Sequence, residues 1–223
     1  MQSIMVKTTS SLKNKFPAYK DHLNKTFLEE LNYKLWSTKG IRFKVSKRLL
    51  TQRDLSNKAI GFLSAYLIIL GLISVYKITG VTNISNNLLA FTSTTLSILL
   101  LAFSQMENAK DFKIRANNYQ QCALKISALY DELRIFKTLQ NVTETEKINL
   151  SKELSTKYQY ILENFPNHED IDYKIFQADH DEYFVLDKWS VFKTKLRYYI
   201  HVKLIYHLMI LLPPLIFITI IFL

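Results

Sequence analysis

Apolar residues gather in three blocks along the chain, and charged residues fill the segments between these blocks. The blocks cover residues 59–76, 88–103 and 204–223, and none contains Asp, Glu, Lys or Arg. With its flanking residues each block is about 20 residues long, enough to cross roughly 30 Å of hydrocarbon as a helix. We therefore predict an all-α membrane protein with a transmembrane hairpin over 59–104 and a C-terminal transmembrane or membrane-associated helix over 201–223.

The third block contains the adjacent prolines Pro213 and Pro214. Proline has no backbone N–H, so the pair should kink a helix. A bilayer helix tolerates this where neighbouring groups satisfy the freed carbonyls. A full crossing places the C-terminus outside, and a re-entrant or surface-lying segment is the alternative.

Positive charge is concentrated before the first block. The 223 residues carry a formal net charge of +10, and residues 1–58 hold 13 Lys and Arg against 4 Asp and Glu. Between the first two blocks Lys77 is the single charged residue. The positive-inside rule therefore predicts that both ends of the hairpin, and with them the N-terminus, are cytoplasmic.

Residues 1–26 form a basic N-terminal arm, and the helical spacing of apolar residues predicts a cytoplasmic amphipathic helix over 27–58. Cationic side chains lie between its apolar positions. They have three interpretations: they enforce topology, they bind anionic lipid headgroups, or they bind nucleic acid directly. The cations of this basic segment are Lys39, Arg42, Lys44, Lys47 and Arg48.

A cytoplasmic helical region is predicted over 105–200. No proline or glycine interrupts residues 86–136, so one continuous helix is expected to leave the membrane and carry a coiled-coil-like seam. The seam either joins a second copy or packs against the chain's own helices. Its residues are Phe112, Tyr119, Cys122, Ile126, Leu129, Leu133 and Phe136.

Later in this region Thr143 and Glu146 have the spacing of a helix capping box. The acidic stretch 167–187 is expected to be a loop. It contains the only clusters of His with carboxylates, which fit a solvated loop better than a metal site because their spacing matches no known motif.

Small and hydroxyl-bearing residues recur on one side of each hairpin helix. Close helix packing explains them, and so does the lining of a water-filled path in an oligomer. These candidate packing or pore residues are Gly61, Ser64 and Gly71 on the first helix and Asn86, Ser93, Ser97 and Ser104 on the second.

Motifs of enzymes are missing from the sequence: there is no His-Glu-x-x-His, no glycine-rich phosphate loop and no Gly-x-Ser-x-Gly. Cys122 is the single cysteine, which excludes an internal disulfide and a multi-cysteine metal site. We predict no enzyme activity, no cofactor and no metal.

The arrangement resembles the SLATT family, the two-helix membrane effectors of prokaryotic conflict systems. The resemblance covers about residues 27–165, and it extends to the C-terminal segment of one subgroup. The residues that carry it are Phe27-Leu-Glu-Glu-Leu-Asn-Tyr-Lys-Leu-Trp-Ser-Thr-Lys-Gly-Ile-Arg-Phe43, Ala59-Ile-Gly-Phe-Leu-Ser-Ala-Tyr-Leu-Ile68 and Tyr119-Gln-Gln-Cys-Ala-Leu-Lys-Ile-Ser-Ala-Leu-Tyr-Asp-Glu-Leu133.

This resemblance implies an oligomeric, pore-forming effector of antiphage defence in the bacterial inner membrane, which depolarises the membrane once a partner senses infection. The similar subgroup is linked to reverse transcriptases, so the implied partner is a reverse transcriptase or a sensor of nucleotide or nucleic-acid signals. The alternative is a non-conducting membrane anchor that recruits a nucleic-acid enzyme through the basic arm.

Overall fold

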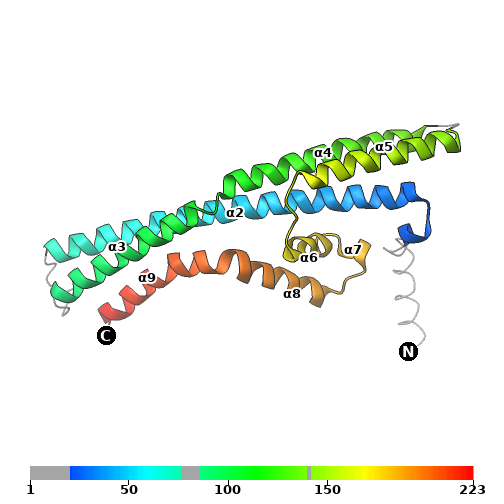
Figure 1. The fold of residues 1–223 in the computed structure, drawn as a ribbon. Coiled ribbons are helices and arrows are strands. Elements are labelled where there is room, and N and C mark those ends of the chain that lie inside the picture. Colours follow the sequence, from blue (N-terminus) through cyan, green and yellow to red (C-terminus); the bar gives the residue numbers. More distant parts are fainter. Residues whose placement is uncertain (1–20, 77–85, 140–141, 223) are drawn as a thin grey trace, which may run out of the picture. The chain divides into compact units, whose positions relative to one another are not determined.

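The computed structural model describes residues 21–76, 86–139 and 142–222, and this part of the chain consists of helices and short connections without any strand (Figure 1). The predicted all-α class is confirmed. Residues 1–20 of the basic arm and most of the turn between the first two blocks lie outside the described residues. The helices are η1 Asp21–Asn24, α2 Phe27–Tyr76, α3 Asn86–Asn108, α4 Phe112–Thr138, α5 Glu144–Glu163, α6 Asp170–Ala178, α7 Asp181–Phe184, α8 Lys188–Tyr199, the π-helical η2 Ile200–Leu204, and α9 Ile205–Phe222.

The chain divides into two compact units. One unit, called the polar unit below, comprises residues 1–46 and 117–197. The other, called the membrane unit, comprises residues 47–116 and 198–223 and therefore contains all three apolar blocks. Each unit is described separately.

α2 is a single helix of 50 residues. The boundary predicted at residue 58 therefore lies inside it. Proline is absent from this segment, and three glycines, Gly40, Gly61 and Gly71, do not interrupt it. A glycine lowers the stability of a helix by about 1 kcal/mol relative to alanine, which packing and length readily offset.

The prediction of one continuous helix from Asn86 to Phe136 is wrong, because the chain turns after Asn108 and restarts at Phe112. Asp111 adopts the left-handed region with φ 49°, which Asp tolerates better than most residues. Its carbonyl then accepts the Arg115 N–H at 3.0 Å and opens α4. Neither Gly nor Pro marks the break, so the sequence pattern did not reveal it.

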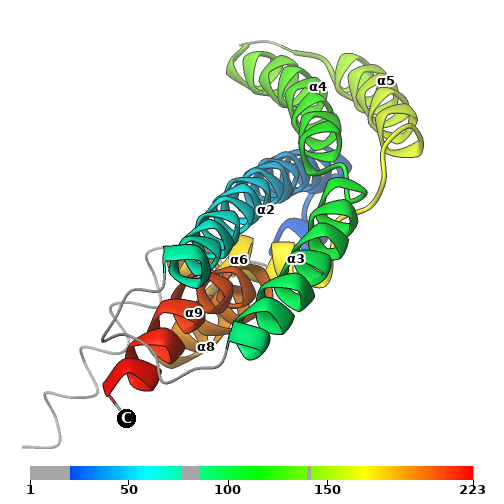
Figure 2. The same cartoon turned by 90° about the vertical axis from the view of Figure 1, so that its left-hand side faces the viewer.

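The core of the polar unit is formed by α2, α4 and α5, and α4 and α5 run side by side in both views (Figures 1 and 2). The predicted capping box of α5 is confirmed, with Thr143 and Glu146 each accepting a backbone hydrogen bond from the other. The buried core residues are Leu31 and Leu35 from α2, Cys122, Ile126, Leu129 and Leu133 from α4, and Leu154, Tyr158 and Ile161 from α5.

The predicted acidic loop over 167–187 is wrong, since most of this stretch forms α6 and α7. Its acidic residues act as caps: Glu169 precedes α6 and Asp172 accepts the Glu169 N–H. The apolar residues Ile175 and Phe176, which share a face of α6 with the buried Asp172, are buried as well. The acidic composition hid this amphipathic pattern.

Candidate functional site in the membrane unit

Within the described residues, three helical segments are long and apolar enough to cross a membrane, and each contains all or most of one apolar block. Within the membrane unit, side-chain hydrogen bonds join the third segment to the first two. In lipid, where the hydrophobic effect does not drive helices together, such hydrogen bonds and close packing select one arrangement of helices.

The first bond compensates for Pro214. In an α-helix the Ile210 carbonyl would accept the N–H of residue 214, which proline lacks. In the structure Tyr66 Oη of α2 donates to the Ile210 oxygen at 3.0 Å. A neighbouring helix thus satisfies a carbonyl freed by the proline pair, and α9 continues through both prolines.

We expect Tyr66→Phe to destabilise the membrane unit by about 0.5–2 kcal/mol, because it leaves the Ile210 carbonyl unsatisfied. In a Pro214→Ala background the restored N–H supplies a partner, so the same substitution should cost almost nothing. Unfolding in mixed detergent micelles measures both values as a double-mutant cycle.

Tyr76→Phe is the matched control, since the Tyr76 side chain is exposed on the same helix. An equal cost of Tyr66→Phe in both backgrounds would show that the hydroxyl does not compensate for Pro214.

The second bond involves Glu107 near the end of α3, a carboxylate only 6% exposed. Tyr206 Oη of α9 donates to Glu107 Oε2 at 2.9 Å, and Lys110 Nζ forms an ion pair with the other oxygen. The sequence pattern did not reveal this group, because Glu107 lies just beyond the charge-free block. The one available signal was a carboxylate a single helical turn after Phe103.

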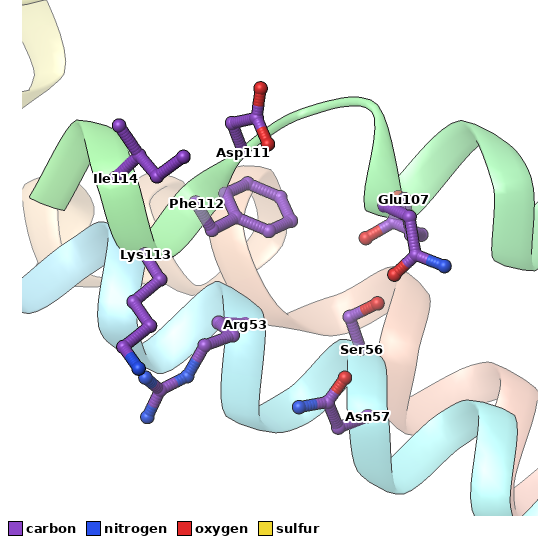
Figure 3. A pocket seen from close by; sticks show the side chains of 9 residues that line it. Arg53, Ser56, Asn57, Glu107, Asp111, Phe112, Lys113 and Ile114 are labelled. Carbon is purple, nitrogen blue, oxygen red and sulfur yellow. The ribbon is translucent and has the colours of Figure 1, made fainter.

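A cavity of about 330 Å³ lies beside Glu107, between α2 and the junction of α3 with α4. Figure 3 shows the terminal groups of Arg53 and Lys113 close together, with Phe112 between α2 and the α3–α4 connection. Arg53 already pairs with Asp54 at 2.7 Å. Because both signs of charge line it, the cavity suits water or a polar group rather than an apolar ligand.

Ser93, Ser97 and Ser104 of α3, called the hydroxyl stripe below, are only weakly covered by the described part of the chain. Ser97 is exposed, and Ser93 and Ser104 are half-buried. Ser97 Oγ donates to the Ser93 carbonyl at 2.8 Å and Ser93 Oγ to the Ala90 carbonyl at 3.0 Å, which satisfies both donors without water. Asn86 begins α3, but its side chain is outside the described part.

Among the described residues, nothing packs closely against the two glycines in the membrane-unit part of α2. A Cβ atom added at Gly61 or Gly71 would meet nothing within 4 Å. Ser64 Oγ donates back to the Ile60 carbonyl at 2.8 Å. Their predicted role in packing or pore lining therefore concerns neighbours outside this chain and stays a prediction.

The heptad residues predicted as a seam are divided between the units. Four of them lie in the core of the polar unit: Cys122, Ile126, Leu129 and Leu133. These four therefore pack against the chain's own helices, which is one of the two alternatives given for the seam. Tyr119 is buried and donates to the Asn167 carbonyl at 2.8 Å. Self-association through these residues stays a prediction. Outside that core, Phe136 is half-buried, and Phe112 lies in the membrane unit.

The basic segment makes internal contacts in both units. Lys39 Nζ lies 3.6 Å from the centroid of the Tyr130 ring, and Lys44 forms an ion pair with Asp179. In the membrane unit Arg48 is buried while Lys47 is exposed. Recruitment of lipid or nucleic acid through these cations stays a prediction, with Lys47 the most accessible of them.

Arg42 is the most buried cation of the basic segment, at 1% exposure. Its Nη1 donates to the Pro166 carbonyl at 2.6 Å and its Nη2 to Asn167 Oδ1 at 3.2 Å. Burial and, secondly, the Arg42 charge lower the pKa of His168. Arg42 thus fixes the segment that connects α5 to α6.

These features define the class: an all-α integral membrane protein in which three apolar helices are joined by polar bonds and carry a separate helical unit. The chain belongs to the SMODS and SLOG-associating 2TM effector domain family 5, which it matches over residues 24–220. The resemblance to SLATT proteins is thereby confirmed and extends through the third helix. No curated protein and no solved structure matches the chain. Membership places it among the membrane effectors of conflict systems.

Proposed function

We propose that this chain is an oligomeric membrane effector that forms or gates a pore, and that it depolarises the membrane in antiphage defence by abortive infection. The observation that carries the proposal is the exposure of α3. Ile98, Leu99 and Leu101 are each at least 60% exposed, and the hydroxyl-bearing Ser97 is exposed as well.

This surface of α3 calls for two kinds of neighbour. Lipid chains suit the leucine and isoleucine side chains, whereas a stripe of small hydroxyl residues suits close helix contact or water. Further copies of the chain supply both, because they bring helices to the stripe and leave the apolar side to lipid.

The proposed topology follows the distribution of cations, with the N-terminus and the polar unit in the cytoplasm of a bacterium and the helices in its inner membrane. The polar unit would then receive the signal from a partner, either a reverse transcriptase or a sensor of nucleotide or nucleic-acid signals. No catalytic step is assigned to the chain.

The alternative, a non-conducting anchor that recruits a nucleic-acid enzyme through its basic arm, has less support. Arg42 and Arg48 are buried and Lys44 is paired. These contacts leave fewer of the cations free to bind a phosphate backbone, which requires several exposed Lys or Arg side chains.

Depolarisation measured with a membrane-potential dye, in cells that carry the partner and the trigger, tests the proposal. Ser97→Leu should reduce the depolarisation rate by about tenfold or more, because it places a bulky apolar group on the stripe. Thr95→Leu is the matched control, since Thr95 is an exposed hydroxyl residue on the opposite side of α3.

Two results would contradict the proposal. One is an unchanged membrane potential in triggered cells that contain the wild-type chain. The other is a strictly monomeric mass in detergent, because one chain offers too few helices to enclose a path. Equal effects of Ser97→Leu and Thr95→Leu would show that the hydroxyl stripe does not line the pore, although the chain would still depolarise the membrane.

A further inference from the structure

α8 exposes its large apolar side chains and partly buries its small polar ones, the reverse of a helix in a water-soluble protein. None of its residues is buried. Trp189, Phe192 and Leu196 are 61%, 53% and 45% exposed, and Ile200 in η2 is 52% exposed. The spacing of three, four and four residues places all four on one face, called the aromatic stripe below.

The other face of α8 is the partly covered one. Ser190, Val191 and Thr194 are half-buried, although two of them are polar and all are smaller than the residues of the stripe. A helix in contact with water buries its large apolar residues and exposes its Ser and Thr. The exposed stripe therefore fits an apolar medium rather than water.

Cations flank the stripe on both sides. Four exposed ones lie within α8, and from residue 188 to residue 223 the sequence has no Asp or Glu at all. Lys193 Nζ lies 5.3 Å from the Trp189 ring centroid. Long cationic side chains beside an apolar stripe are typical of helices at a membrane surface. The four are Lys188, Lys193, Lys195 and Arg197.

α8 begins at a strong cap and continues into an apolar helix. Asp187 Oδ2 accepts the backbone N–H groups of Trp189 and Ser190 at 3.1 Å, and Oδ1 accepts the Ser190 hydroxyl at 2.6 Å. η2 and α9 follow without a break. The chain that carries the stripe thus runs directly into a membrane segment.

We infer that α8 is a membrane-surface helix, with its aromatic stripe in the boundary between headgroups and acyl chains and its cations against the phosphates of anionic lipids. Charge complementarity and continuity with α9 select lipid over a second copy or another protein as the occupant of this face. The inference concerns lipid contact alone, so it holds whether or not the chain conducts ions.

Tryptophan fluorescence of the full chain in proteoliposomes tests the inference. The chain has two tryptophans, Trp36 and Trp189. Trp36→Phe leaves Trp189 as the single reporter. Phosphatidylcholine–phosphatidylglycerol vesicles with bromine atoms high on the acyl chains should quench Trp189 emission at least about twofold more than vesicles brominated near the chain ends, as expected for a shallow position. Iodide in the buffer should quench it weakly.

A second arm tests the cations. Lys195→Glu should weaken bromolipid quenching in vesicles that contain phosphatidylglycerol. Lys152→Glu on α5 is the matched control, since Lys152 is also exposed, and it should change nothing.

Strong iodide quenching without bromolipid quenching would overturn the inference, because the stripe would then face water. Protection from iodide without bromolipid quenching would also overturn it, since protein rather than lipid would cover the stripe. Equal effects of the two charge reversals would exclude a contact of α8 with anionic headgroups.

Discussion

Arg42→Met is expected to destabilise the polar unit by about 2–4 kcal/mol, because it removes the two hydrogen bonds that the buried guanidinium donates to the Pro166 carbonyl and the Asn167 amide oxygen. Methionine preserves most of the apolar stem, so the loss reports on the guanidinium rather than on packing. The connection between α5 and α6 should loosen first.

Urea unfolding of the detergent-solubilised chain measures this effect, with Trp36 emission as the reporter in a Trp189→Phe background. Lys44→Met is the matched control. Its ion pair with Asp179 is partly exposed on both sides, so its loss should cost no more than about 1 kcal/mol. Similar costs for both variants would show that Arg42 is an ordinary surface cation.

The same variant has an effect on pH dependence. The lowered pKa of His168 means that the unfolded chain takes up the proton more readily, so stability is full above the ordinary histidine pKa of 6.5 and falls as the pH drops below it. Removing the Arg42 charge should raise the His168 pKa and reduce this loss. An NMR titration of His168 in both chains measures the change.

Gly40→Ala is expected to cost about 1–3 kcal/mol, although alanine is the better helix former. A Cβ at this position would lie 2.4 Å from Phe176 Cε2. Phe176 is 1% exposed, and its ring centroid lies 4.4 Å from that of His180 and 5.1 Å from that of Trp36. The neighbouring rings therefore restrict how far the Phe176 ring can shift to make room for a Cβ atom.

The same urea titration measures the cost. Phe176→Leu should relieve the clash, so the double variant with Gly40→Ala should lose less than the sum of the two single losses. Gly61→Ala serves as the control because its Cβ would meet nothing within 4 Å. If Gly40→Ala increases stability, the contact between α2 and α6 is looser than the structure shows.

Features that depend on local pattern could be predicted from the sequence. Three charge-free runs are long enough for a bilayer whatever they pack against, so the apolar helices were predicted correctly. The capping box of Thr143 and Glu146 is equally local, because both partners lie within one turn. The heptad residues Cys122 to Leu133 were expected to be buried against some helix, and the spacing could not tell which one.

Features that depend on distant partners could not be predicted. The carbonyl that fixes Arg42 lies more than a hundred residues away, so Arg42 resembled one more cation of an exposed basic face. In the sequence Glu107 is simply the first charged residue after a membrane segment, and its partner Tyr206 lies 99 residues further along the chain. The left-handed turn at Asp111 lacks the glycine that usually marks such a position.

The two hydrogen bonds that join α9 to α2 and α3 fix the rotation of α9 about its own axis. Apart from Tyr206, His207 and Thr219 its residues are apolar, so contact with lipid alone favours no particular rotation of the helix about its own axis. Tyr206 and Ile210 lie one turn apart on the same side, and their bonds to Glu107 and Tyr66 hold that side toward α3 and α2. The proline pair therefore helps to fix the rotation of α9 about its own axis, because the carbonyl that it frees becomes an acceptor on one side of the helix only.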